Sequence, residues 1–172
     1  MSYEVKVYPD SILRKKSETI EHIDENILKL LDDMKDIMYS YNGIGLAAEQ
    51  LGILKRLVVI DTKPGGNNEL IKLINPEIIA AEGTYEEHEE GCLSVPGYYD
   101  TIKNRKKGVK VKYIDIDGND RIIETEDFLS VVLQHEIDHL NGILFVDRLS
   151  PIRKAIFKKE WKKMQKERSA QQ

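Results

Sequence analysis

Residues 134–139, with the sequence QHEIDH, carry side chains that could bind a metal ion and move a proton. Four residues of α-helix advance about 400°, so His135 and His139 would point the same way from adjacent turns. Two such imidazoles can share a metal ion, with Glu136 close to a metal-bound water but not a ligand. The pattern also arises by chance, as two surface histidines with an incidental acid. Asp138 would be either a partner of one ligand imidazole or a surface acid.

Two histidines leave such an ion short of a third protein ligand. No histidine follows His139, and the nearest later acid is Asp147, although zinc peptidases of the HExxH type take their third ligand from that side. The single cysteine, Cys92, stands upstream between Gly91 and a Ser-Val-Pro loop, where the backbone can approach a ligand closely. A free cysteine is usually a small buried hydrophobic residue. As a ligand, Cys92 would complete a Cys₁His₂ site that leaves a fourth position for water, as catalytic sites do.

The elements that must position these side chains follow an α+β pattern. Apolar residues at helical spacing predict a first helix over residues 24–41, with Asp24 as its cap. The same spacing predicts the helix of the two histidines, beginning near Asp127 and ending at residues 141–142. Alternation and turn chemistry predict strands at residues 57–61, 70–74, 77–88, 109–116 and 121–124, with turns at 64–67 and 117–118.

A last helix is predicted from Pro151 to about residue 168, and it carries eight lysine or arginine residues. Its apolar residues Ile152, Ile156 and Trp161 are expected to dock on the sheet. The basic residues would then form a solvated face.

Composition limits the class of protein. The 172 residues suit a single domain, and 26 basic against 30 acidic residues give a net charge of −4, which argues against a general nucleic-acid binder. A lone cysteine excludes an intrachain disulfide and fits a reducing compartment. We find no secretory signal and no apolar run of about 18 residues. The expectation is a soluble, intracellular protein with no membrane partner.

Three motifs together resemble the signature of the peptide deformylase family. They are GIGLAAEQ at residues 43–50, EGCLS at residues 90–94 and QHEIDH at residues 134–139, in the order and spacing of that family. The resemblance spans nearly the whole chain, and the helical C-terminus is similar to the bacterial and organellar branch. Two positions depart from the family pattern. Ser11 stands where a second proline is common, and Tyr99 stands where many relatives carry an arginine.

The resemblance implies an α+β fold with antiparallel sheets around a central metal-bearing helix, flanked by an N-terminal and a C-terminal helix, in one catalytic domain over residues 1–172. It implies a bacterial cytoplasmic enzyme that removes the formyl group from the formyl-methionine of new polypeptides. Cys92, His135 and His139 would hold ferrous iron, which zinc or nickel often replaces in purified protein. Association with the ribosome through the basic C-terminal helix is a further expectation, without recognition of a specific nucleic-acid sequence.

The residues support a mechanism for that reaction. A divalent metal lowers the pKa of bound water towards about 7, and Glu136 would accept the water proton and pass it to the departing amine. By resemblance, the Gln50 side-chain amide and the Leu93 backbone N–H stabilise the oxyanion. The alternative for Gln50 is an ordinary polar cap.

Substrate contacts are expected from apolar and small residues. An extended peptide could add to the chain edge at Ile44 and Gly45 by main-chain hydrogen bonds, and Gly91 lets a ligand approach closely. A methionine side chain needs an apolar slot beside the metal, with Ile44 on one side. Its other side would consist of Phe128, Val131 and Val132, which could equally be ordinary core residues.

Two other functions remain open on the sequence alone. A zinc peptidase acting on internal bonds would suit the softness of a Cys/His₂ site, but the upstream cysteine and the missing downstream ligand argue against it. A non-catalytic protein-binding module is disfavoured because every proposed catalytic position is intact.

Overall fold

The computed structural model describes residues 2–63 and 69–171, and its elements form the α+β fold that the sequence predicts. The larger, antiparallel sheet has the strand order β1-β2-β3-β6-β7, and β4 pairs with β5 in a separate hairpin. The helices are α1 (Glu25–Ser40), α2 (Phe128–Leu140) and α3 (Pro151–Ala170). The strands are β1 (Gly45–Ala47), β2 (Leu57–Ile60), β3 (Ile71–Glu82), β4 (His88–Cys92), β5 (Val95–Ile102), β6 (Gly108–Ile114) and β7 (Asp120–Thr125).

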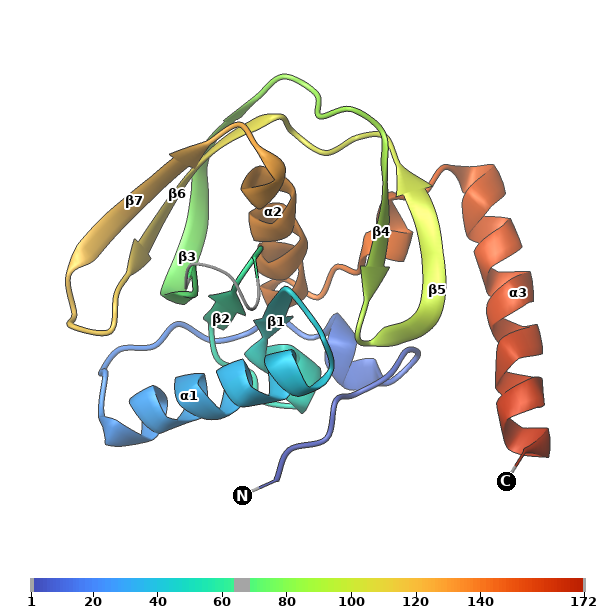
Figure 1. Cartoon of the computed structure of the whole chain (residues 1–172), viewed down its shortest axis with the longest axis horizontal. Coiled ribbons are helices and arrows are strands. Elements are labelled where there is room, and N and C mark those ends of the chain that lie inside the picture. Colours follow the sequence, from blue (N-terminus) through green and yellow to red (C-terminus); the bar gives the residue numbers. More distant parts are fainter. Residues whose placement is uncertain (1, 64–68, 172) are drawn as a thin grey trace.

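Helix α2 lies at the centre of the molecule, between the larger sheet and the β4–β5 hairpin (Figure 1). A helix covered on several sides is apolar nearly all round. Accordingly, Leu133, Ile137 and Leu140 are buried against sheet residues such as Val58 and Leu73. The expected central helix between antiparallel sheets is confirmed.

The predicted helix starts are confirmed by their capping hydrogen bonds. The Asp24 carboxylate accepts from the Ile27 N–H at the start of α1, and the Asp127 carboxylate accepts from the Leu129 N–H at the start of α2. Ser150 caps α3 in the same way, with proline in the first turn. These side chains satisfy backbone donors that helix ends otherwise leave free.

The strands differ from the prediction at several places. Strand β3 continues through Asn75 and Pro76, because a register shift between Ile74 and Glu77 accommodates a proline that cannot donate to the ladder. Strands β1, β4 and β5 were not predicted, and Pro96 and Gly97 near the start of β5 are typical of a loop. The extended stretch predicted at residues 77–88 is also too long, because β3 ends at Glu82. The turn predicted at residues 64–67 lies outside the described residues.

Helix α3 lies beside β5, away from the larger sheet (Figure 1). Phe157 and Trp161 are buried against Tyr98 of β5, but Ile152 and Ile156 are 76% and 45% exposed, so their predicted docking is wrong. Successive helical residues point about 100° apart, which turns Ile156 away when Phe157 faces the hairpin. In the described part of the chain, no helix combines the length and apolarity needed to cross a membrane.

Candidate metal centre

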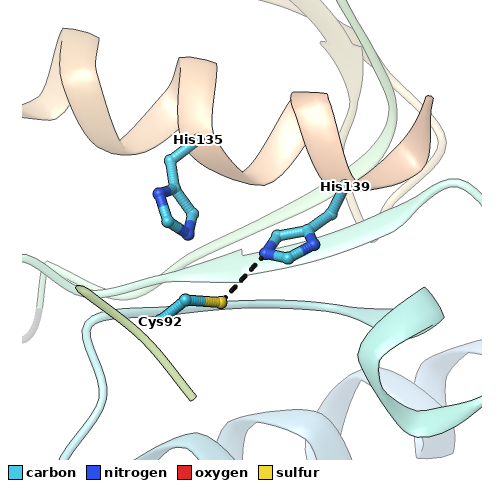
Figure 2. A group of neighbouring side chains, drawn as sticks. All are labelled: Cys92, His135 and His139. Carbon is cyan, nitrogen blue, oxygen red and sulfur yellow. Dashed lines mark hydrogen bonds between the residues drawn. The ribbon is translucent and has the colours of Figure 1, made fainter. Parts of the chain in front are cut away.

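The structure brings Cys92, His135 and His139 together (Figure 2), with their ligand atoms all within 4.8 Å of one another. Both histidines project from α2 towards Cys92 at the end of β4, and the Sγ atom of Cys92 is 3.3 Å from Nε2 of His139. One thiolate and two imidazoles converging at this separation suit a divalent metal ion with tetrahedral preference. The donor set therefore fits a metal that keeps one coordination position free.

A bulge in the β4–β5 hairpin aims Cys92 at the helix. The register shifts between Gly91 and Cys92, and such a shift re-aims the side chain that follows it. The Ser94 backbone N–H and the Gln50 side-chain amide both donate to the sulfur, at 3.4 Å and 3.5 Å. These two donors hold the sulfur in place at the end of β4.

A carboxylate fixes the orientation of His135. Oε1 of Glu90 lies 2.9 Å from Nδ1 of His135, which leaves Nε2 of that ring for a metal. Burial opposes ionisation of Glu90, but hydrogen bonds from Arg105 and His135 outweigh it and hold the pKa of Glu90 below its usual range. For His139, burial lowers the pKa, so its imidazole stays neutral, as a ligand must be.

Asp138 belongs to a buried ionic network. Its carboxylate accepts hydrogen bonds from Arg105 at 2.7 Å and from Arg148 at 2.9 and 2.7 Å, and Arg105 also holds both oxygens of Glu90. Asp138 is therefore neither a direct partner of a ligand imidazole nor a surface acid. The network ties α2 to the hairpin that carries Cys92.

Glu136 lies buried beside His135, one of the three converging side chains. Burial raises the pKa of its carboxyl group to about 7, and its Oε1 atom has no hydrogen-bond partner among the described residues. A methyl group at Gly45 would overlap the Glu136 carboxylate, so a larger residue where β1 passes this side chain would displace it. The side chain also lines the cavity that opens over the three donors.

A cavity of about 680 Å³ opens over this centre. Gln50 is buried at its floor, where its carbonyl oxygen accepts from the Ala47 N–H and its amide donates to Ser94 Oγ at 3.1 Å. Gln50 therefore caps a turn, as the alternative interpretation of this residue predicted. The bond from the Ala47 N–H to its carbonyl oxygen also leaves its amide facing Cys92. The predicted site residues that line the cavity are Ile44, Gly45, Gln50, Gly91, Cys92, Leu93, Phe128, Val131, Val132, His135 and Glu136.

The sequence left open whether Phe128, Val131 and Val132 line a substrate slot or belong to the core, and the structure gives them features of both. Val131 and Val132 are buried, and Val132 also packs in the core cluster of α2 and the sheet. Phe128 is half exposed at the cavity wall. The valines are therefore core residues with one side on the cavity.

Tyr99, which the sequence already marked as a departure from the family pattern, is 66% exposed, lays its ring against Gly91 and lines the cavity. Sequence reasoning missed other residues around the site. Arg105 was missed because it lies 15 and 33 residues from its partners Glu90 and Asp138. Glu49 is inside a recognised motif, yet nothing in the pattern shows that it is buried behind His139.

A helix bearing HExxH, a cysteine as the third donor and an apolar cavity over them define a metal-dependent hydrolase. A family model described as polypeptide deformylase matches residues 2–155. A relative described as peptide deformylase, from Thermodesulfovibrio yellowstonii, is 51% identical over 160 residues, which cover 92% of this chain and 96% of the relative. A peptide deformylase structure from Legionella pneumophila is 43% identical, covers 98% of both chains and has a TM-score of 0.89. A peptide deformylase structure from Synechococcus elongatus, in complex with actinonin, is 39% identical, covers 87% of this chain and 81% of that chain, and has a TM-score of 0.83.

The chain therefore belongs to the polypeptide deformylase family. It is a metal-dependent enzyme that removes the N-formyl group from nascent peptides.

Proposed function

We propose that Cys92, His135 and His139 hold a ferrous ion, and that the enzyme acts there on the N-terminal formyl-methionine of nascent peptides. The observation that carries this proposal is the convergence of the three donors beside the buried Glu136, at the floor of an apolar cavity. The choice of iron follows the family expectation, since the same donors also accept zinc or nickel.

Glu136 acts as the acid and base of the reaction. A divalent cation bound at the three donors supplies a Lewis acid, which makes water acidic enough to lose a proton near neutral pH. Glu136 accepts that proton and passes it to the departing amine. Its raised pKa of about 7 supports this role, because proton transfer is most effective when the pKa lies near the working pH.

Two donors stabilise the oxyanion that forms on the formyl group. The side-chain amide of Gln50 is one, and its orientation is supported by the bond between its carbonyl oxygen and the Ala47 N–H. The backbone N–H of Leu93 is the other, in a residue that lines the cavity. Preorganised donors of this kind lower the barrier because they need not reorient during the reaction.

The peptide lies extended along the cavity, and its methionine fills the apolar slot. Strands β1 and β4 each have an edge with no paired strand among the described residues. Gly45 on β1, Gly91 on β4 and Ile44 just before β1 line the cavity. Main-chain hydrogen bonds to such edges give affinity without reading side chains. The methionine slot is formed by Phe128, Val131 and Val132, with Ile44 on the opposite side.

Filling the slot should discriminate between substrates. In the Val131→Phe variant we expect kcat/KM for formyl-Met peptides to fall at least about ten-fold further than for formyl-Ala peptides, because only the long side chain meets the added ring. Overpacking a residue that serves the core alone costs about 1–3 kcal/mol of stability and slows both substrates alike. The measurement is the ratio of the two kcat/KM values, set beside the melting temperature. An unchanged ratio with a lower melting temperature would assign Val131 to the core.

Formate release from formyl-Met-Ala-Ser, by protein loaded anaerobically with ferrous iron, tests the proposed substrate and metal. We expect one formate to be released for each formyl peptide that is consumed, and no cleavage of casein. Zinc- and nickel-loaded samples show whether iron is the most active metal. Casein cleavage without formate would instead identify an internal peptidase.

We also propose that residues 1–172 work as a single catalytic domain in the bacterial cytoplasm, and that α3 contacts the ribosome. The basic side chains of α3, including Lys158 and Lys162, are largely exposed, as binding to ribosomal phosphates requires. A Lys158→Glu/Lys162→Glu variant should cosediment with ribosomes at least about ten-fold less well at low salt, with unchanged turnover of tripeptides. The matched control is Lys15→Glu/Lys16→Glu, which reverses two exposed charges elsewhere. Equal loss in both variants would contradict a contact through α3.

A further inference from the structure

A buried carboxylate, Glu49, lies behind the imidazole of His139. Glu49 is 0% exposed, and neither of its carboxylate oxygens has a hydrogen-bond partner among the described residues. Its Oε1 atom is 3.8 Å from Nδ1 of His139, which is buried and equally without a partner there. Burying a carboxylate without a hydrogen bond is costly, so the pair requires an explanation.

The orientation of His139 supplies one. Its Nε2 atom faces Cys92, and Figure 2 shows the other ring nitrogen turned away from the sulfur. A neutral imidazole that binds a metal through Nε2 carries its proton on Nδ1. That N–H donor is buried and needs an acceptor, and the Glu49 carboxylate is the acceptor that the structure holds next to it.

The other histidine shows the completed form of this arrangement. Nδ1 of His135 is hydrogen-bonded to Glu90 at 2.9 Å, on the side of the ring away from Cys92. The distance of 3.8 Å between His139 Nδ1 and Glu49 Oε1 is about 1 Å longer than a direct hydrogen bond. A small side-chain movement or one bridging water would complete the contact.

We propose that Glu49 is the positioning residue of His139: it accepts the Nδ1 proton directly or through one water, and so holds the ring in the orientation that retains the metal. The proposal rests on His139 being a metal ligand. Carboxylate partners of ligand histidines fix the tautomer and raise the basicity of the ring, and losing one typically lowers metal affinity about 10–100-fold.

Metal release from the full chain tests this role. Zn²⁺-loaded protein is mixed with excess chelator, and we expect Glu49→Leu to release zinc about 10–100-fold faster than the parent. Glu49→Gln should release it at an intermediate rate, because the amide oxygen can still accept the Nδ1 proton. The control Glu21→Gln removes one exposed acidic charge and should release zinc at the parent rate.

Two further measurements separate positioning from general damage to the fold. The melting temperature of metal-free Glu49→Leu should equal or exceed that of the parent, because a buried carboxylate without a partner has been removed. In ¹⁵N spectra of the zinc-loaded protein, the Nδ1–H signal of His139 should move in Glu49→Leu while that of His135 stays in place. If Glu49→Leu does not fold, the signal of His139 and the release rate in Glu49→Gln decide the question.

The outcomes distinguish this proposal from the ligand assignment beneath it. A parent protein that takes up no zinc overturns the ligand set, and the role of Glu49 with it. The role of Glu49 alone is overturned if the parent retains zinc and both Glu49→Gln and Glu49→Leu release zinc at the parent rate. In that case the His139 signal also stays in place in both variants.

Discussion

Replacing Glu136 with alanine is expected to leave the metal in place while turnover falls by at least about 100-fold. The reason is that the proposed role of Glu136 is proton transfer, while the proposed ligands are Cys92, His135 and His139. His135→Ala and His139→Ala should lose metal and activity together. The measurements are metal content per chain and formate release for all three variants.

A second substitution at the same position separates chemistry from packing. Glu136→Gln keeps the shape of the side chain but cannot accept a proton, so its activity should fall as far as that of Glu136→Ala. Its melting temperature should not fall, because a buried carboxylate with a free oxygen has been replaced by a neutral group. Loss of metal from either variant would identify Glu136 as a ligand and contradict its role as acid and base.

Removing the side-chain amide of Gln50 is expected to lower kcat by about 100–1,000-fold, the usual effect of losing one oxyanion donor. Gln50→Leu also removes the acceptor of the buried Ala47 N–H, so the free energy of unfolding should fall by about 1–3 kcal/mol. The two effects are read separately, from kcat of the folded enzyme and from denaturant unfolding.

Ser94→Ala provides the matched control for Gln50. It removes the hydroxyl group that accepts from the Gln50 amide at 3.1 Å, and leaves the amide itself in place. Its kcat should therefore change less than about ten-fold, far less than that of Gln50→Leu. Equal kcat losses in both variants would mean that Gln50 acts only by holding the loop around Ser94.

Local patterns in the sequence were enough to predict the family and the framework. The helix caps at Asp24, Asp127 and Ser150 and the hairpin at residues 117–118 depend on neighbouring residues, so they can be recognised without tertiary contacts. The same holds for the spacing of His135 and His139, which the geometry of one helix determines. The three motifs indicated the family to which the chain belongs.

The residues that support the site depend on long-range packing. Glu90, Arg105 and Asp138 are far apart in the chain, and only the docking of the β4–β5 hairpin against α2 makes them a buried network. Periodicity could not reveal β5, because its first residues are typical of a loop. It also could not show that Ile152 and Ile156 of α3 are exposed, because the rotation of a helix about its axis depends on what the helix packs against.

The sequence by itself determined the fold class, the family and the residue types able to bind a metal and transfer a proton, since all of these follow from short-range spacing and motif order. Tertiary structure alone decided which carboxylate stands behind each imidazole. Glu90 reaches His135 from the hairpin and Glu49 lies behind His139 from the turn after β1, whereas Asp138, the neighbour of His139 in the sequence, is held by two arginines. The physical reason is that a buried carboxylate takes its partner from whatever element packs against it, and that packing is not local in the sequence.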